Sequence, residues 1–262
     1  MVTSAELKFA PRDGVKLAYL DVGTGDPALL FVHGWCCDRA YWRDQIPEFA
    51  QRHRVVAADL RGTGGSDAPD QDYLIAQFAD DVAWLCGEIG LEKPVIVGHS
   101  MGGLIALDIA RRYPELPRAL VFNDAVLTPF PEQFEALRVA LMAGLQSPAY
   151  KAVAANFVNS AMFTPDSRDD LKTEIVDGMT NAPQRLMHTA LSSILSGEQM
   201  TPGPLPVPSL FIRAATQTAT DEELRQRYPG MEVTTVDCGH FIQMEKPQEF
   251  NSILRQFVEK VA

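Results

Sequence analysis

Short apolar runs alternate with longer amphipathic stretches along most of this chain. The short runs are rich in β-branched and aromatic residues, and the longer stretches repeat apolar residues at the three- and four-residue spacing of a helix. This alternation is typical of a mostly parallel sheet with helices on both faces, so we predict an α/β fold with about eight strands. The expected strands are Glu6–Ala10, Val15–Val22, Ala28–Val32, Val55–Asp59, Val95–Val97, Ala119–Phe122, Ser209–Ile212 and Glu232–Asp237. The helices expected between them are Ala40–Gln51, Tyr73–Ile89, Met101–Tyr113, Asp221–Tyr228 and Gln248–Val261.

One long segment, residues 128–203, contains helical patterns and no strand pattern. Prolines separate these helical patterns, and the proline-rich stretch Thr201–Pro208 returns the chain to the sheet as an extended connector. We therefore expect residues 1–127 and 204–262 to form the core, and residues 128–203 to form an all-helical lid inserted between two strands. The expected lid helices are Glu132–Leu145, Ala149–Met162, Arg168–Met179 and Gln184–Leu195.

The composition excludes several classes of function. The 262 residues are 46% hydrophobic and 22% charged, which suits one well-packed globular domain. The net charge of −11 argues against nucleic acid and against an anionic membrane surface, because both attract clustered Lys and Arg. Met1–Tyr19 lacks the apolar core of a secretory signal, and no stretch has the length of a membrane span. We expect a cytoplasmic protein that acts on a small neutral or weakly charged molecule; the pattern predicts no oligomeric state.

The cysteines match neither a metal site nor a disulfide framework. They are Cys36, Cys37, Cys86 and Cys238. A bridge between the adjacent Cys36 and Cys37 would close a strained ring, so we expect free thiols. No histidines and carboxylates share a metal-ligand spacing either, and we expect neither a metal nor a cofactor.

The strongest chemical signal is a glycine-rich turn between an expected strand and an expected helix. Val95–Val97 runs into Gly98-His-Ser-Met-Gly-Gly103, which contains the pattern G-x-S-x-G in that setting. A nucleophile on so sharp a turn has strained dihedral angles, and a side chain at either flanking glycine would collide with backbone. We therefore predict that Ser100 is a nucleophile at a helix N-terminus, whose dipole favours the anion formed during attack.

His240 is the predicted general base. It follows the last expected strand, so its loop lies at the strand's C-terminal end, where the imidazole can reach Ser100. A serine hydroxyl is a weak nucleophile and needs a neutral imidazole to accept its proton. The other histidines are expected to be structural: His99 packing behind the turn, His33 bonding to backbone, and His53 and His188 at the surface or in the lid.

Four sequence blocks together resemble the α/β-hydrolase superfamily over nearly the whole chain, the lid excepted. They are Gly98-His-Ser-Met-Gly, His33-Gly34-Trp35, Asp59-Leu-Arg-Gly-Thr-Gly-Gly-Ser66 and Gly239-His240-Phe241. The resemblance implies a serine, acid and histidine triad. It also implies an oxyanion hole made by the backbone N–H of Met101 and that of Trp35, whose indole would line the pocket floor. An aspartate in place of Ser100 would indicate a haloalkane dehalogenase or an epoxide hydrolase, so serine argues against both.

The acid of the triad has two candidates. In most of the superfamily it follows the seventh expected strand, but here the next residues, Arg213–Thr220, contain no carboxylate. Asp221 comes next, and Thr220 with Glu223 forms a capping-box pattern that accounts for the acids there. Some members carry the acid after an earlier strand, where this chain has Asp124. We favour Asp124 over Asp221.

The sequence favours hydrolysis of a carboxylic ester or lactone that carries a hydrophobic group. Soft and aromatic lid side chains suit an apolar pocket. They are Met142, Met162, Met179, Met187 and Met200 with Phe130, Phe134, Phe157 and Phe163. Three alternatives stay open: a receptor for a small molecule, a carbon–carbon bond hydrolase, and a cofactor-free dioxygenase of hydroxyquinolone-type aromatics. The dioxygenases share His33–Cys36 and the early acid, but carry a histidine where this chain has Cys37.

Overall fold

The computed structural model describes residues 6–129 and 131–262, so Met1–Ala5 and Phe130 lie outside the described residues. Eight strands form one sheet in the order β1-β2-β4-β3-β5-β6-β7-β8. The pairs β1/β2 and β2/β4 are antiparallel, and every other neighbouring pair is parallel, which confirms the predicted fold class. The strands are β1 (Lys8–Arg12), β2 (Val15–Val22), β3 (Leu29–Val32), β4 (Val55–Ala58), β5 (Val95–His99), β6 (Ala119–Asn123), β7 (Ser209–Ala214) and β8 (Glu232–Val236).

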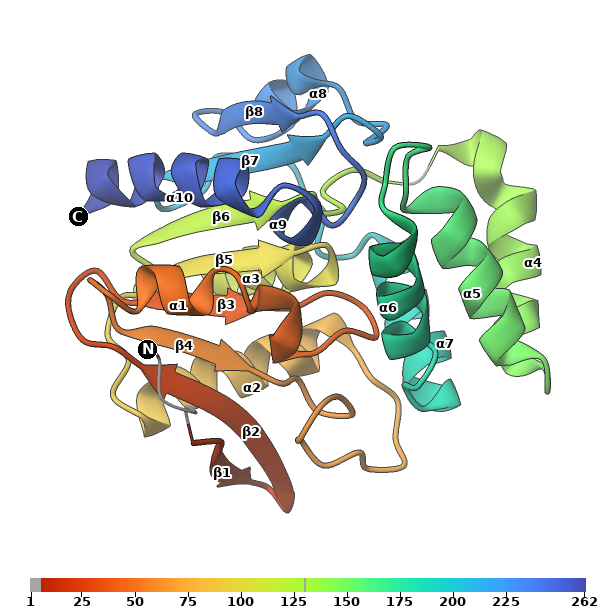
Figure 1. Cartoon of the computed structure of the whole chain (residues 1–262), viewed down its shortest axis with the longest axis horizontal. Helices are drawn as coiled ribbons and strands as arrows, with labels where there is room; N and C mark the ends of the chain where they lie inside the picture. Colours follow the sequence, from red (N-terminus) through yellow and green to blue (C-terminus); the bar gives the residue numbers. More distant parts are fainter. Residues whose placement is uncertain (1–5, 130) are drawn as a thin grey trace.

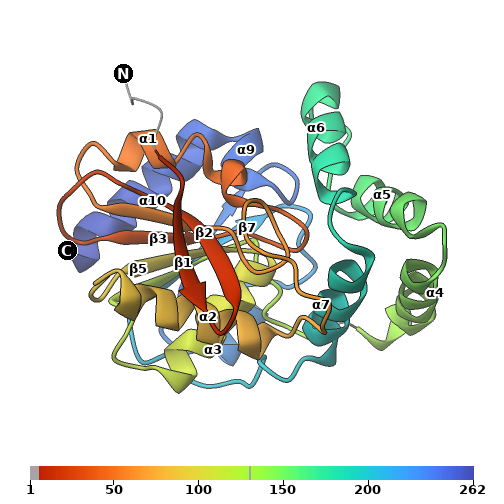
Figure 2. The ribbon, with the colours of Figure 1, turned by 90° about the horizontal axis from the view of Figure 1, so that it is seen from below.

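Helices cover both faces of the sheet (Figures 1 and 2). The helices α1 and α10 lie on one face, and α2 and α3 lie on the other. The helices are α1 (Ile46–Phe49), α2 (Ile75–Glu88), α3 (Met101–Arg112), α4 (Glu135–Gln146), α5 (Tyr150–Ala161), α6 (Asp169–Met179), α7 (Gln184–Ser196), α8 (Asp221–Arg227), α9 (Ile242–Glu245) and α10 (Pro247–Val261). Two short 3-10 helices are η1 (Arg39–Trp42) and η2 (Glu132–Phe134).

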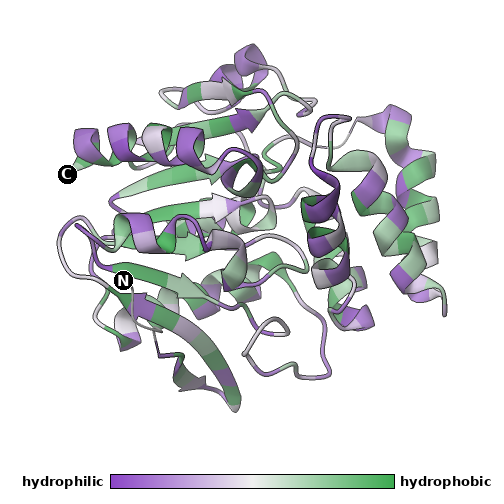
Figure 3. Ribbon diagram, viewed as in Figure 1, coloured by the Kyte–Doolittle hydropathy of each residue, from purple (hydrophilic) through white to green (hydrophobic). Residues whose placement is uncertain are grey.

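The central strands are buried on both faces, which explains their uninterrupted apolar sequences. Along β3, Leu30 and Val32 belong to the core cluster that includes α2 and α3. Leu29 and Phe31 belong to the opposite cluster, which includes α1 and α10. The central strands are accordingly mostly green in Figure 3, where green marks hydrophobic residues.

The helices α4 to α7 form one insertion between β6 and β7, and they lie beyond the arrowheads of the parallel strands in Figure 1. Several side chains of the core bind it, two aromatic ones among them. Trp35 Nε1 donates to the carbonyl of Met187 at 3.0 Å, and the hydroxyl of Tyr41 donates to that of Ile175 at 3.3 Å. The insertion therefore covers the C-terminal edge of the sheet, where the loops after the strands gather. Within the described ranges, no helix has both the length and the apolar character needed to cross a membrane.

One predicted helix is divided. Residues 40–51 form η1 and α1 instead of a single helix. Asp38 caps η1 by accepting the backbone N–H of Ala40 at 2.7 Å. Pro47 stands in the first turn of α1, where its missing N–H costs nothing, and it could not have continued a preceding helix. The short helix α9 was not predicted, because one helical turn is too short to show a period.

Candidate active site

Ser100 stands on a strained turn between β5 and α3. Its backbone angles are φ 52° and ψ −115°, a region that side chains rarely occupy. The turn is tight on both sides: a Cβ on Gly98 would lie 2.3 Å from the carbonyl oxygen of Gly102, and one on Gly102 would lie 2.2 Å from that of Val32. Only glycine fits at these two positions, so the local sequence produces this turn.

Asp124 and His240 are joined by a short hydrogen bond. Asp124 directly follows β6, and its Oδ2 lies 2.6 Å from His240 Nδ1. Its other oxygen, Oδ1, accepts the backbone N–H of Ala214 at 2.9 Å, and its own N–H donates to the carbonyl of Ile212 at 2.8 Å. Both bonds attach the carboxylate to β7. Because an ionised carboxylate only accepts hydrogen bonds, Nδ1 carries the proton and Nε2 remains free to accept one.

Asp221, the other candidate acid, has a structural role. It is the first residue of α8, and its Oδ1 accepts Arg213 Nε at 2.9 Å. Thr220 and Glu223 make both hydrogen bonds of the predicted capping box. The Asp221 carboxylate therefore pairs with an arginine at the start of a helix, and the carboxylate beside His240 is that of Asp124.

Ser100, Asp124 and His240 all line one cavity of about 280 Å³ between the sheet edge and the insertion. Among the described residues, no hydrogen bond joins the side chains of Ser100 and His240. Both residues nevertheless line the same cavity. The rest of its wall is mostly apolar and includes Trp35. The other lining residues are Val126, Phe134, Leu137, Arg138, Leu141, Phe157, Ala161, Met162, Leu191, Ile194, Leu195, Thr216, Gln217 and Thr218.

Three of the predicted lid side chains, Phe134, Phe157 and Met162, line this cavity. Others serve packing: Met179, Met187 and Met200 are buried in the core. The loop Thr216–Thr218 after β7 also lines the cavity, although the sequence did not predict it there. The resemblance to the superfamily could have indicated this position, because most members carry the acid of the triad in this same loop.

The loop before Trp35 passes directly beside Ser100. A Cβ on Gly34 would lie only 3.2 Å from the Cβ of Ser100. Within the described part of the chain, the backbone N–H groups of Trp35 and Met101 donate to no protein acceptor, and Met101, as the first residue of α3, has no acceptor inside the helix. The N–H groups next to Gly34 and Ser100 are therefore without a protein partner in the described part of the chain.

Two buried histidines hold the loops around the site. His33 Nδ1 contacts the carbonyl of Gly34 at 2.9 Å, and its Nε2 accepts the N–H of Leu60 at 3.0 Å. His99 Nε2 donates to the carbonyl of His240 at 3.0 Å. Burial lowers the pKa of both side chains, that of His99 well below its ordinary value, which favours the neutral imidazole in the folded protein.

These histidines should make stability depend on pH. Below pH 6.5, the ordinary pKa, the unfolded chain binds more protons on His33 and His99 than the folded chain does. The free energy of unfolding therefore has its full value above pH 6.5. As the pH is lowered further it should decrease, by up to about 1.4 kcal/mol per pH unit for each histidine. Urea unfolding between pH 7.5 and 5 measures this slope. His99→Gln should flatten it, and an unchanged slope would contradict the assignment for His99.

The remaining histidines and the cysteines take no part in the cavity. His53 Nδ1 contacts the carbonyl of Pro27 at 2.9 Å. All four cysteines are free and buried, and burial raises the pKa of Cys86 to about 12. Cys37 donates to the carbonyl of Trp35 at 3.4 Å and does not line the cavity. Among the described residues no group of three or more potential metal ligands occurs.

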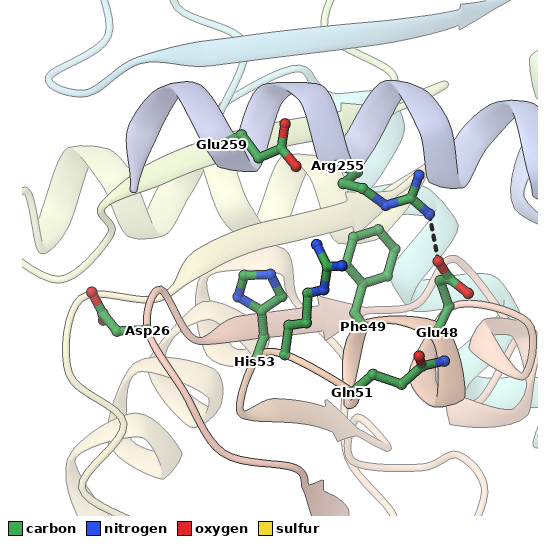
Figure 4. A pocket seen from close by; sticks show the side chains of 8 residues that line it. Asp26, Glu48, Phe49, Gln51, His53, Arg255 and Glu259 are labelled. Atoms are coloured by element: carbon green, nitrogen blue, oxygen red, sulfur yellow. Dashed lines mark hydrogen bonds and ion pairs between the residues drawn. The ribbon is translucent and has the colours of Figure 1, made fainter.

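A second hollow, of about 460 Å³, lies on the face of the sheet that α1 and α10 cover, between α10 and the segment before β4 (Figure 4). Charged side chains line it, and Arg255 pairs with Glu48 across it. His53 is its only histidine, and none of its lining residues carries a hydroxyl or thiol nucleophile. This hollow therefore lacks a hydroxyl such as the one that Ser100 brings to the first cavity.

Comparison with known proteins gives one family. Its model, described as the alpha/beta hydrolase fold, matches residues 27–247. The chain is 30% identical to the dihydrolipoyllysine-residue acetyltransferase component of the acetoin cleaving system of Cupriavidus necator, over 97% of this chain and 69% of that protein. It is 29% identical to a haloalkane dehalogenase of Sphingobium indicum, over 98% and 96%. A thermophilic esterase from Thermogutta terrifontis has a similar structure, with a TM-score of 0.83, 25% identity, and coverage of 98% of this chain and 99% of that one.

Proposed function

The chain belongs to the α/β-hydrolase family, and on that premise we propose that it hydrolyses a carboxylic ester or lactone through an acyl-enzyme on Ser100. The observation that supports this proposal best is the 2.6 Å hydrogen bond between Asp124 and His240 at the wall of the cavity that contains Ser100. A serine, a neutral imidazole and an orienting carboxylate are the three groups that acyl transfer needs.

In the proposed reaction, His240 Nε2 takes the proton of Ser100 Oγ while Oγ attacks the substrate carbonyl carbon. The carbonyl oxygen becomes an oxyanion, and the N–H groups of Trp35 and Met101 stabilise it. The imidazolium then gives its proton to the departing alkoxide, and the acyl group stays on Ser100. Water attacks this ester with His240 again as base, which releases the acid and restores the hydroxyl. Asp124 remains ionised throughout and stabilises the imidazolium.

The nucleophile favours an acyl substrate over a haloalkane. If Ser100 Oγ displaced a halide from an alkyl carbon, the product would be an ether, which has no carbonyl for water to attack. The enzyme would be inactivated after a single reaction. Attack on an ester or lactone instead forms an acyl-serine that water can hydrolyse. The serine therefore supports a different reaction from that of the dehalogenase relative.

The cavity supports a small substrate with a hydrophobic group. Its wall is mostly apolar, and 280 Å³ holds about nine groups of the size of a water molecule. Residues 128–203 act as a lid over it, and residues 1–127 and 204–262 form the catalytic core. The insertion supplies Phe157, Leu191 and Ile194 to the cavity wall, so the lid determines which acyl or alcohol groups fit.

Reaction with a fluorophosphonate tests the proposal. We expect a single mass increase located on the peptide that contains Ser100, and much slower labelling of His240→Ala, because only an activated serine attacks the phosphorus. The same protein should turn over p-nitrophenyl butanoate many times. Heat-denatured protein is the control for non-specific labelling. Labelling elsewhere would overturn the assignment of Ser100, and a single turnover would indicate a receptor instead of an esterase.

A further inference from the structure

The loop that carries His240 is bonded to the insertion as well as to the core. The backbone N–H of His240 donates to the carbonyl of Met162 at 2.9 Å, just after α5. The ring of Phe163 stacks on that of Phe241, with centroids 5.8 Å apart. The side chain of Met162 also lines the cavity. The segment between α5 and α6 thus contacts both the substrate site and the backbone of the general base.

Glu245 lies at the centre of this contact. Its Oε2 accepts the hydroxyl of Ser167, in the α5–α6 segment, at 2.6 Å, and the backbone N–H of Gly239 at 3.3 Å. Ser167 is itself buried, and its hydroxyl oxygen also accepts the N–H of Thr164 at 3.0 Å. One carboxylate oxygen therefore joins the insertion to the residue that precedes His240.

The side chain of Glu245 and the backbone of Met162 pack tightly around Gly239. A Cβ on Gly239 would lie 2.6 Å from Glu245 Oε1 and 2.7 Å from the carbonyl oxygen of Met162. Oε1 is buried, and no hydrogen-bond partner for it occurs in the described part of the chain. Burying a carboxylate oxygen without a partner is costly, so the bonds made by Oε2 must offset that cost. The bonds to Oε2 and the enclosed position of Oε1 together restrict where this partly buried carboxylate can lie.

We propose that Glu245 is a positioning residue for the general base: it holds the His240 loop to the insertion, so that the imidazole stays aligned between Asp124 and Ser100. This inference rests on the proposed function, because it assumes that His240 is the base. Asp124 holds the imidazole from the sheet side, and Glu245 links the backbone of the preceding residue, Gly239, to Ser167 of the insertion. A loss of the second contact would let the ring tilt while the cavity remained formed, and a shift of about 1 Å is enough to slow acyl transfer strongly.

Three variants test the role. We expect Glu245→Ala to lower kcat for p-nitrophenyl butanoate roughly 10- to 100-fold with little change in KM, because alignment is lost and substrate contacts are not. Glu245→Gln should recover most of kcat, since its amide oxygen can accept both hydrogen bonds. Ser167→Ala keeps the bond between Glu245 and Gly239 and removes the bond between Glu245 and the insertion, together with the acceptor of the Thr164 N–H, so its kcat should fall by a smaller factor. Glu249→Ala, an exposed glutamate at the start of α10, is the matched control and should match the wild type.

A spectroscopic measurement separates this role from a general loss of stability. The proton that His240 Nδ1 shares with Asp124 should give a downfield proton resonance, assigned by its absence in His240→Ala. We expect it to broaden in Glu245→Ala and to stay sharp in Glu245→Gln, at temperatures where thermal melts show both variants folded. If Glu245→Ala does not fold, Ser167→Ala takes its place in both measurements.

The outcomes are distinct. Wild-type kcat with a sharp resonance in Glu245→Ala would overturn the inference, and so would a Glu245→Gln variant as slow as Glu245→Ala. If the wild type shows the resonance but hydrolyses no ester, the proposed function fails. In that case the resonance alone still decides whether Glu245 positions His240.

Discussion

Ser100→Ala is expected to abolish ester hydrolysis, with a loss of kcat of several orders of magnitude, on the order of 10⁴ to 10⁶. Without Oγ no acyl-enzyme can form, and His240 has no proton to accept. The oxyanion N–H groups of Trp35 and Met101 would remain, so slow direct attack by water on a bound ester is the only reaction left. Steady-state hydrolysis of p-nitrophenyl acetate, butanoate and hexanoate measures the effect.

Ser160→Ala is the matched control, since this exposed serine of α5 bonds only to the carbonyls of its own helix. It should retain full activity. If Ser100→Ala keeps more than about a tenth of wild-type activity, Ser100 is not the nucleophile. The alternative of cofactor-free oxygenation, in which the base matters more than the serine, would then become the leading hypothesis. Oxygen uptake with a hydroxyquinolone would be the next measurement.

Asp124→Asn is expected to lower kcat by about a thousandfold or more, and Asp221→Asn to leave it nearly unchanged. The amide would offer its N–H₂ group or a weaker acceptor to His240 Nδ1, which removes the preference for the reactive tautomer and the charge that stabilises the imidazolium. Asp221 pairs with Arg213 at the start of a surface helix and has no bond to the imidazole. Its loss should therefore change the stability of α8 by less than about 1 kcal/mol.

The two aspartate variants should be compared at saturating substrate, with circular dichroism confirming that both are folded. The opposite result would also identify the acid. Near-normal kcat in Asp124→Asn together with a collapse in Asp221→Asn would restore the acid to the loop after β7, where most of the superfamily carries it. The bond between Asp124 and His240 would then serve the structure of the His240 loop and not the reaction.

The sequence by itself determined the features that depend on neighbouring residues. The buried strands were evident because a strand covered on both faces must be apolar throughout. The turn at Ser100 was evident because its strained angles and close contacts require Gly98 and Gly102 within four residues of each other. The helix break after η1 was missed, although Pro47 marks it, because the apolar pattern continues across the proline.

Only the tertiary structure decided which acid meets His240, because the two residues are 116 positions apart. The parallel register of β6 with β7 places Asn123 opposite Ile212, so that the next residue, Asp124, reaches the N–H of Ala214.

The contact between Glu245 and Ser167 spans 78 positions and likewise carries no local pattern. Periodicity and turn chemistry report on residues within a few positions of one another, whereas a site assembled from loops at a sheet edge depends on strand order and register. Those two properties exist only once the strands have paired.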